Sequence, residues 1–371
     1  MQAIVVTPRT PNTLRIIEQE KPELSSREML LEIQKVGICG TDRDIIAGFY
    51  GEPPIGSDSL VLGHESLARV SKVGGRVKGF EEGDLVVPTV RRNCSENCLN
   101  CRNGESDMCL SGHYKEHGIK GLHGFAREFA NSDGAFVVRL PESLSHTGIL
   151  LEPLTIVEKA VAQTYLIQRS RMKWNAKSAL VLGAGPVGLL ATAILRLRDL
   201  EVHTLATRSE ESLKARLVEQ TGATYINAKK TPLKTLENQY DIVFEITGNT
   251  LVALEAQNLI GVNGIVSFLG VYKEEHLTED AGRLFTDLVL GNRIYFGSVN
   301  ANKTYFVEGA KDLIRITKRW SGFLEKMITR RASPEDLEKA YSPENEEEIK
   351  TVIEFKNDVT HLTETHQQYE I

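Results

Sequence analysis

Short apolar runs separated by proline and polar breaks dominate the first part of the chain. Residues 1–36 follow this pattern, and the runs at 35–38 and 60–62 each lead into a glycine-containing turn with polar side chains. The same alternation of strand and turn continues through 83–88. Apolar runs of about four to eight residues between turn residues are typical of β-strands. This region is therefore predicted to form a partly closed, β-barrel-like domain.

The pattern changes near residue 178, where apolar strands begin to alternate with helices. Residues 178–182 form an unbroken apolar strand, 189–197 an apolar helix and 202–206 a second strand. The alternation continues with strands expected at 241–248, 264–270 and 294–299 and helices at 250–260 and after residue 300. Strands alternating with helices predict an α/β domain with a parallel sheet.

A glycine-rich turn joins the strand at 178–182 to the helix that follows it. Residues 183–188 have the spacing G-x-G-x-x-G. Between a strand and a helix this spacing is the dinucleotide fingerprint, because its glycines let the backbone approach a pyrophosphate at a helix N-terminus. The alternative is an ordinary strand–turn–helix connection. We predict a doubly wound, Rossmann-type nucleotide-binding sheet.

The end of the second strand bears on which nicotinamide cofactor binds. NAD sites carry an acidic residue about 20 positions after the glycines, where it holds the ribose 2′-hydroxyl. This chain has Thr207, Arg208 and Ser209 instead, and an arginine with two hydroxyls suits a 2′-phosphate. Because Glu210 and Glu211 follow closely, NADP⁺ is predicted as the preferred cofactor and NAD⁺ as a possible one. The alternative for Arg208 is a solvated residue at a helix start.

The length of the chain calls for more than one domain, because 371 residues are too many for one compact core. We predict a catalytic domain at 1–156, a nucleotide-binding domain at 157–298 and a return to the catalytic domain at 299–371. The return rests on a strand expected at 349–355. The polar tail at 357–371 is predicted to be partly disordered.

Composition argues against several classes of function. A formal net charge of −6 disfavours a nucleic-acid-binding surface. The first residues lack a charged segment followed by an apolar run, so no signal peptide is expected. No apolar stretch approaches the roughly 20 residues that a membrane-spanning helix needs. We expect a cytoplasmic protein that acts on a small molecule, with neither nucleic-acid nor membrane partners.

Four of the five cysteines fall within sixteen residues, and they are Cys94, Cys98, Cys101 and Cys109. Thiolates at such intervals can surround one zinc ion tetrahedrally and close a loop that has almost no apolar residues of its own. Four ligands leave no open coordination position, so the loop 94–109 is predicted to hold a structural zinc. The alternative is a set of surface thiols in a reducing compartment.

The fifth cysteine lies in a different setting. Cys39 follows one apolar strand, His64 and Glu65 follow another, and glycines flank both sites. A thiol, an imidazole and a carboxylate are side chains that zinc accepts. A catalytic zinc is therefore predicted, for a total of two zinc ions per chain. The alternative is that Cys39 and His64 are ordinary core residues and that the only zinc is structural.

Four motifs, in this order and at these separations, resemble one enzyme family. They are G-I-C-G-T-D at 37–42, G-H-E at 63–65, the four-cysteine loop and G-x-G-x-x-G, and together they resemble the zinc-dependent medium-chain dehydrogenases over nearly the whole chain. Shorter segments resemble the archaeal-type glucose 1-dehydrogenase branch, at 90–92, 116–119, 121–124, 152–154, 158–159, 298–300 and 348–353. The resemblance implies a GroES-like catalytic domain beside the Rossmann domain and a homo-oligomer, either a dimer or a tetramer.

The resemblance also implies roles at the catalytic zinc. Cys39 and His64 would ligate the metal, and Glu65 and Glu152 are the acidic candidates for direct or water-mediated ligation. Thr41 occupies the place of the hydroxyl that relays the substrate proton.

Substrate and cofactor contacts follow from the same resemblance. Glu116, Glu152 and Asn300 match positions that hydrogen-bond sugar hydroxyls, whereas Asp44 stands where many relatives carry a relay histidine. The cofactor would contact Gly183, Gly185, Pro186, Val187, Gly188, Thr207, Arg208, Ser209, Thr247, Gly248, Leu269, Gly270, Ser298 and Asn300.

The predicted reaction is the oxidation of an aldose, in the first place β-D-glucose, to its 1,5-lactone with NADP⁺. A polyol or threonine dehydrogenase of the same family is the alternative enzyme. A non-catalytic NADP-binding protein is the alternative from another class, and its signature would be the loss of catalytic ligands. Cys39, His64 and Glu65 are all present, which disfavours that reading.

Overall fold

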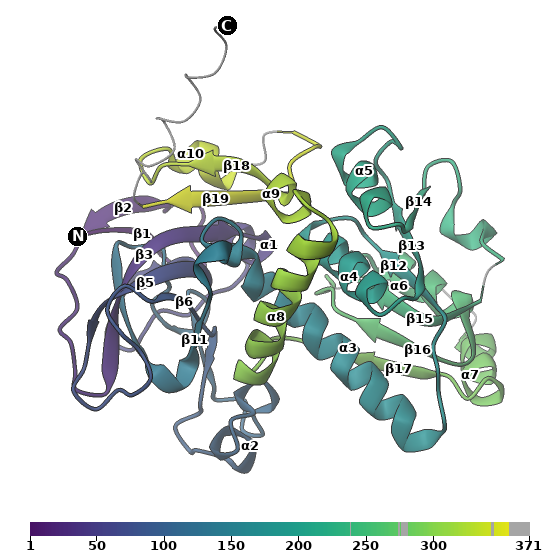
Figure 1. The fold of residues 1–371 in the computed structure, drawn as a ribbon, viewed down its shortest axis with the longest axis horizontal. Coiled ribbons are helices and arrows are strands. Elements are labelled where there is room, and N and C mark those ends of the chain that lie inside the picture. Colours follow the sequence, from purple (N-terminus) through teal and green to yellow (C-terminus); the bar gives the residue numbers. More distant parts are fainter. Residues whose placement is uncertain (238, 274, 276–280, 343–344, 356–371) are drawn as a thin grey trace, which may run out of the picture.

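The structure is a computed structural model that describes residues 1–355, apart from residues 238, 274, 276–280 and 343–344. The predicted disorder of 357–371 therefore lies outside the described residues. Figure 1 shows a β-rich domain on one side and a helix-covered sheet on the other. Helices α3 (Leu151–Arg171) and α8 (Lys303–Arg319) pack together between these two parts.

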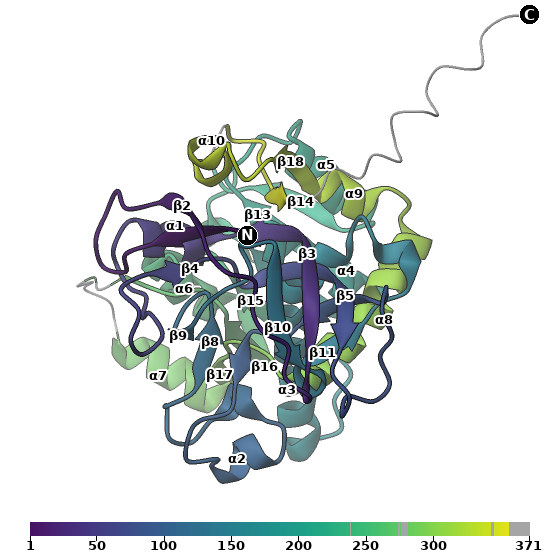
Figure 2. The ribbon, with the colours of Figure 1, turned by 90° about the vertical axis from the view of Figure 1, so that its left-hand side faces the viewer.

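The β-rich domain, which faces the viewer in Figure 2, is built from mostly antiparallel strands. A seven-stranded sheet has the order β11-β6-β5-β3-β19-β18 with β10 paired to β3, and two three-stranded sheets have the orders β2-β1-β4 and β7-β8-β9. The strand bounds are β1 Gln2–Val6, β2 Arg15–Glu18, β3 Glu28–Ile38, β4 Leu60–Val61, β5 Glu65–Val73, β6 Leu85–Pro88, β7 Arg91–Arg92, β8 Lys115–His117, β9 Gly121–Leu122, β10 Phe129–Asp133, β11 Val137–Arg139, β18 Ile328–Ala332 and β19 Lys350–Glu354. Its short helices are α1 Gly40–Ile46, α2 Leu99–Arg102, α9 Phe323–Met327 and α10 Leu337–Tyr341.

The last described strand belongs to the same sheet as an early one. β19 pairs antiparallel with β3, and Thr351 lies opposite Ile38 while Val352 lies opposite Gly37. Val352 and Ile353 are fully buried. The pairing places the C-terminal strand directly beside the strand that ends at Cys39, so residues about 300 positions apart can share one site.

The second domain is a six-stranded sheet of order β14-β13-β12-β15-β16-β17 in which every neighbouring pair is parallel. The α/β, doubly wound prediction is confirmed. The strands are β12 Ser178–Leu182, β13 Glu201–Ala206, β14 Thr224–Asn227, β15 Tyr240–Glu245, β16 Ile260–Phe268 and β17 Ile294–Gly297. The helices are α4 Pro186–Leu197, α5 Leu213–Gln220, α6 Thr250–Ala256 and α7 Ala281–Leu290.

Several boundaries in this domain differ from the sequence pattern, and the largest differences, of four residues each, adjoin one another. The helix expected at 250–260 ends at Ala256, and a single 3-10 turn, Gln257–Leu259, follows it. Strand β16 then begins at Ile260, four residues before the predicted start, because Ile260 is buried and pairs with Tyr240 on β15. A contact between strands, which no local pattern records, sets this boundary.

The sequence predicts that the chain has no membrane-spanning helix. Within the described part of the chain, no helix is both long and apolar enough to cross a membrane.

Candidate metal and cofactor sites

The predicted catalytic ligands converge at one point in the β-rich domain. Cys39 follows β3 and caps α1, whereas His64 lies between β4 and β5. The ligand atoms of Cys39, His64 and Glu65 all lie within 4.8 Å of one another, and Cys39 Sγ is 3.2 Å from His64 Nε2. Gly63 has a φ of +84°, and a Cβ atom there would lie 2.7 Å from the Val36 side chain. Glycine at position 63 thus permits the turn that delivers His64.

Asp42 orients this group, a role that sequence reasoning did not assign. One carboxylate oxygen accepts a 3.0 Å hydrogen bond from the backbone N–H of Cys39, and the other lies 3.6 Å from His64 Nδ1. Burial would raise the pKa of Asp42, but His64 and the Cys39 N–H hold it below its usual value. A carboxylate behind the far nitrogen of a histidine fixes the ring and leaves Nε2 for a metal. The available signal was the aspartate in the G-I-C-G-T-D motif.

Lys350 is a second partner that the sequence did not reveal. Its ammonium donates 2.5 Å and 3.1 Å hydrogen bonds to Glu65 Oε1 and the carbonyl of Ile38, and all of it is buried on β19. Glu65 is therefore held as a paired carboxylate beside the metal-ligand group. The segment 348–353 belonged to the resemblance, but nothing in its spacing showed which residue it would face.

Glu152, in the first turn of α3, adds a second carboxylate near the same point. Burial, together with the neighbouring charge of Glu65, raises the pKa of Glu152 to about 7, although His64 opposes the shift. Its oxygens do not belong to the tight group formed by Cys39, His64 and Glu65 among the described residues. Thr41 lies in the first turn of α1, where its backbone N–H donates to Cys39 Sγ at 3.2 Å.

The sulfur, imidazole and carboxylate donors fit zinc. The half-buried thiol of Cys39 and His64 Nε2 face each other at 3.2 Å, and Glu65 offers a carboxylate oxygen within 4.8 Å of both. Zinc bound by such a set would supply Lewis-acid chemistry at an open coordination position.

The predicted sugar residues Glu116 and Asn300 meet where β8 of the β-rich domain lies against the segment that follows β17. Asn300, in the left-handed conformation after β17, donates a 2.7 Å hydrogen bond to Glu116 Oε1 on β8. Arg91 donates to the same oxygen through Nε and Nη2 at 3.0 and 2.9 Å. The turn after Glu116 brings Gly118 against the backbone of Gly63, so the carboxylate lies on the segment that packs beside His64.

A buried network behind this pair was also missed. Asp107, inside the four-cysteine loop, pairs with Lys159 of α3 at 2.7 Å and accepts a 3.0 Å hydrogen bond from Asn302. Its carbonyl accepts a 3.0 Å bond from Arg91, the partner of Glu116. Asp107 thereby connects the cysteine loop, the base of α8 and the residues predicted to bind sugar.

The four loop cysteines form a compact sulfur group. The sulfurs of Cys94, Cys98, Cys101 and Cys109 lie within 4.8 Å of one another, and all four are free thiols. Backbone N–H groups lower the pKa of Cys98 to about 6, whereas burial raises that of Cys101 to about 12. Donors of this number and kind fit one tetrahedral zinc with no open position.

The glycine-rich turn lies at the carboxyl edge of the parallel sheet. The backbone N–H of Gly183 bonds to the carbonyl of Leu205 on the adjacent strand, which brings 183–188 beside 207–209. A Cβ atom on Gly188 would lie 2.0 Å from the Gly183 carbonyl oxygen, so only glycine fits there. The remaining cofactor residues predicted from the resemblance follow β15, β16 and β17 at the same edge, namely Thr247, Gly248, Leu269, Gly270, Ser298 and Asn300. Ligands of open parallel sheets bind at this edge.

Arg208 already has an acidic partner from the other end of the chain. Its Nη1 lies 2.6 Å from a carboxylate oxygen of Glu346. Glu210, the nearest acidic residue in sequence, instead contacts Lys230 at 2.9 Å and Asn227 at 3.3 Å. The acidic neighbours noted in the sequence are therefore not the group that faces Arg208.

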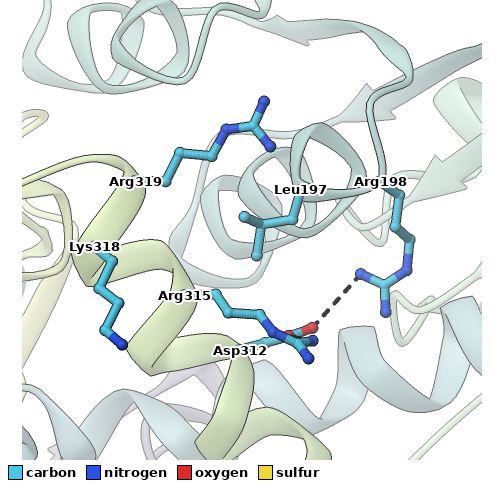
Figure 3. A pocket seen from close by; sticks show the side chains of 6 residues that line it. All are labelled: Leu197, Arg198, Asp312, Arg315, Lys318 and Arg319. Atoms are coloured by element: carbon cyan, nitrogen blue, oxygen red, sulfur yellow. Dashed lines mark hydrogen bonds and ion pairs between the residues drawn. The ribbon is translucent and has the colours of Figure 1, made fainter.

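A surface cavity of about 530 Å³ between α4 and α8 lies apart from these sites and has a basic lining (Figure 3). Its three arginines already have acidic partners: Asp312 contacts Arg315 at 2.6 Å and Arg198 at 3.6 Å, and Arg319 contacts Asp199 at 3.1 Å. Because the cavity holds none of the metal-ligand or cofactor groups, it is not the reaction site.

Comparison with known proteins identifies relatives along almost the entire chain. Residues 145–355 match the family described as "Glucose dehydrogenase C-terminus", and residues 25–142 match "Alcohol dehydrogenase GroES-like domain". The chain is 42% identical over 359 residues to glucose 1-dehydrogenase of Methanocella arvoryzae, covering 96% of this chain and 99% of the relative. It is also 42% identical over 355 residues to glucose 1-dehydrogenase 1 of Caldivirga maquilingensis, with the same two coverages.

A solved structure agrees in fold. The glucose dehydrogenase of Haloferax mediterranei, in complex with NADP, Zn and gluconolactone, matches with a TM-score of 0.88 and 35% identity. The match covers 96% of this chain and 100% of the other.

Proposed function

Because the chain belongs to the zinc-dependent glucose dehydrogenases of the medium-chain superfamily, we propose that it oxidises β-D-glucose at C1 to the 1,5-lactone with NADP⁺. The observation that carries this proposal is a group of zinc donors close to carboxylates that are suited to bind a sugar, where the two domains join. Glu116 and Asn300 are hydrogen-bonded at 2.7 Å across that junction. The ligands of the Haloferax mediterranei relative support the same cofactor, metal and product class.

Different side chains have different roles in the reaction: metal binding, proton transfer and orientation of a ligand. Oxidation at C1 removes a hydride, which NADP⁺ accepts, and a proton from the anomeric hydroxyl. Zinc held by Cys39, His64 and a carboxylate would lower the pKa of that hydroxyl and stabilise the developing negative charge on oxygen. Thr41 accepts the proton and passes it on toward solvent or the cofactor ribose. Asp42 keeps the imidazole of His64 oriented during this step.

Carboxylates select the sugar. Glu116 Oε1 is saturated by Arg91 and Asn300, whereas Oε2 has no hydrogen-bond partner among the described residues and can accept a sugar hydroxyl. Glu152 offers a second acceptor near the metal-ligand group. An ionised carboxylate accepts several hydroxyl hydrogen bonds, which suits a polyhydroxy substrate.

Initial rates with D-glucose, D-galactose, D-xylose, sorbitol and L-threonine, each with NADP⁺ and NAD⁺, test the proposal. Aldose turnover that favours NADP⁺ and is lost after chelation is the expected result. Turnover of only sorbitol or threonine would assign the polyol or threonine alternative. Binding of NADP⁺ and two zinc ions without turnover of any of the five would point to a substrate outside this set or to the non-catalytic alternative.

We further propose two zinc ions per chain, one at each sulfur-containing group, and elemental analysis of the purified protein tests that number. The cluster of reduced thiols supports a cytoplasmic location, where cysteines are kept reduced. Cell fractionation tests the location.

A homo-oligomer, a dimer or a tetramer, is the proposed assembly. Strand β17 is the last strand of its sheet, and α7, which precedes it, exposes the apolar side chains of Phe285, Val289 and Leu290. An open sheet edge beside exposed apolar residues is a surface that a second chain can cover. Light scattering coupled to size-exclusion chromatography measures the mass.

A further inference from the structure

An acidic segment of the catalytic domain, residues 346–348, contacts two cationic side chains near the start of helix α5. They are Arg208, which precedes the helix, and Lys214 in its first turn. The Glu346 carboxylate lies 2.6 Å from Arg208 Nη1, and the Glu346 carbonyl accepts a 3.0 Å hydrogen bond from Lys214. Glu347 accepts a 2.7 Å hydrogen bond from the backbone N–H of Leu213, the first residue of α5. Two neighbouring glutamates thus hold an arginine, a lysine and a helix N-terminus.

These are the groups that an external anion would use. Arginine side chains and helix N-terminal N–H groups are the common partners of phosphates in proteins. Burial and the nearby charge of Arg208 lower the pKa of Lys214, while Glu346 and Glu347 oppose this shift. The two cations are therefore close enough to repel each other, and carboxylates from the same chain relieve that repulsion.

The segment is anchored independently of Glu346. Glu348 contacts Arg43 at 2.9 Å and Arg330 at 3.3 Å, and both of these arginines belong to the catalytic domain. Because Glu348 holds the backbone, the Glu346 side chain can leave Arg208 without release of the segment. Glu346 is largely exposed, at 73% of its side chain, which leaves it room to turn away.

We propose that Glu346 is a cofactor-specificity residue that competes with the 2′-phosphate of NADP⁺ for Arg208. The inference rests on the proposed function, which requires NADP⁺ at this edge of the sheet. NADP⁺ displaces the Glu346 carboxylate from the arginine, whereas NAD⁺, with a 2′-hydroxyl, leaves the pair intact. An NAD site usually takes its carboxylate from the end of the second strand. Here residues 207–209 have none, and the catalytic domain supplies it.

The exposed fractions of the Arg208 and Glu346 side chains indicate how strongly Glu346 weakens NADP⁺ binding. The Arg208 and Glu346 side chains are 30% and 73% exposed. Exposed ion pairs contribute little, so the carboxylate weakens NADP⁺ binding by about two- to fivefold. A competition of this size tunes the cofactor ratio and does not abolish NADP⁺ binding.

The test compares Glu346→Gln with the wild-type enzyme by isothermal titration calorimetry. Adenosine 2′,5′-bisphosphate and NADP⁺ should bind about two- to fivefold more tightly to the variant, while 5′-AMP and NAD⁺ bind unchanged. Glu338→Gln is the matched control, because Glu338 is an exposed glutamate on α10 of the same domain and its replacement changes the net charge equally. The control should leave all four affinities unchanged.

A double-mutant cycle shows whether Arg208 mediates the effect. In the Arg208→Ala background, Glu346→Gln should no longer change the affinity for the bisphosphate. Unchanged or weaker NADP⁺ binding by Glu346→Gln, or an equal gain in the Arg208→Ala background, would overturn the inference. If the wild-type enzyme binds neither NADP⁺ nor the bisphosphate, the proposed function itself fails. The two failures are therefore distinguishable.

Discussion

The two sulfur-containing metal groups are built in opposite ways. The four-cysteine group takes all its donors from the sixteen residues 94–109, and local backbone N–H groups contact the sulfurs directly, as Cys98 does with Cys94 at 3.3 Å. The other group combines Cys39 and His64 from different parts of the sheet and depends on Lys350 near the opposite end of the chain.

The difference in construction indicates that the four-cysteine group contributes to stability and that the group of Cys39, His64 and Glu65 contributes to the reaction. A zinc ion held by the sulfur-only group would have no open coordination position and would stabilise the loop that supplies the four sulfurs. The mixed group is surrounded by side chains whose charges are balanced through long-range contacts, including Asp42, Lys350 and Glu152. Perturbed carboxylates around one point are typical of functional sites. Substitutions in the two groups should therefore have different consequences.

The largest effect is expected at Cys39. Cys39→Ala removes a proposed zinc ligand, and kcat should fall at least about 1,000-fold, because the loss of even one electrostatic stabiliser costs about 100- to 1,000-fold. Elemental analysis should find one zinc per chain instead of two, with the fold retained by circular dichroism. Normal kcat in a variant that keeps both zincs would remove Cys39 from the site.

Thr41 tests the chemistry of the same group without removing the metal. Thr41→Ala should lower kcat by about 100- to 10,000-fold, the range for loss of a positioned proton-transfer group. The Kd for NADP⁺, measured by fluorescence titration, should stay close to the wild-type value. Thr41→Ser keeps the hydroxyl and is the matched control. An unchanged kcat in the alanine variant would exclude Thr41 from the proton route.

Cys101 provides the counterpart in the other group. Cys101→Ala should release the structural zinc and lower the free energy of unfolding by about 4 kcal/mol or more, as loss of a structural metal does. Denaturant unfolding measures the change. The zinc at Cys39 and His64 should remain, and chelation should abolish the turnover of the variant as it is expected to do for the wild-type enzyme. Unaltered stability would show that the loop folds without metal.

Asp107 tests the connection between the four-cysteine loop and the residues predicted to bind sugar. Asp107→Asn leaves Lys159 without its carboxylate, and a shift of the loop in response would displace the Asp107 main-chain carbonyl that accepts a hydrogen bond from Arg91, the partner of Glu116. Misplacement of a substrate-binding residue should raise the KM for glucose by about ten- to a hundredfold. The Kd for NADP⁺ should not change. Equal weakening of sugar and cofactor would indicate a general structural defect.

The smallest effect is expected at Glu158, away from both groups. Burial and the charge of Asp312 raise the pKa of Glu158 to about 8, although Arg198 opposes the shift, and nearby Glu308 adds to it. The folded protein therefore binds a proton that the unfolded chain releases near pH 4.5, and this contribution to stability is lost as pH rises from about 4.5 to about 8.

Glu158→Gln should remove that pH dependence. When the pH is raised from 5 to 9, the free energy of unfolding of the variant should increase by about 1 kcal/mol or more relative to that of the wild type. Urea unfolding at each pH measures this difference. Glu219→Gln, at an exposed position on α5, is the matched control and should change stability by less than about 0.5 kcal/mol at either pH. A constant difference for Glu158→Gln across the range would contradict the raised pKa.

Much of the fold was predictable because it depends on short-range patterns. The strand at 178–182, its glycine turn and the following helix appear as predicted, since turn geometry and apolar periodicity act within a few residues. The early start of β16 was not predictable, because it depends on the pairing of Ile260 with Tyr240. The catalytic-site and domain assignments remain predictions that the variants above address.

The amino-acid sequence by itself determined which donors are available and which lie close along the chain. The four-cysteine spacing, the G-x-G-x-x-G turn and the absence of an acidic residue at 207–209 could all be read directly. Only the tertiary structure decided which distant groups meet: Lys350 with Glu65, Asn300 with Glu116, and Glu346 with Arg208. The physical reason is that each of these contacts forms only after strands and domains from distant parts of the chain have packed together, and no local pattern records that packing.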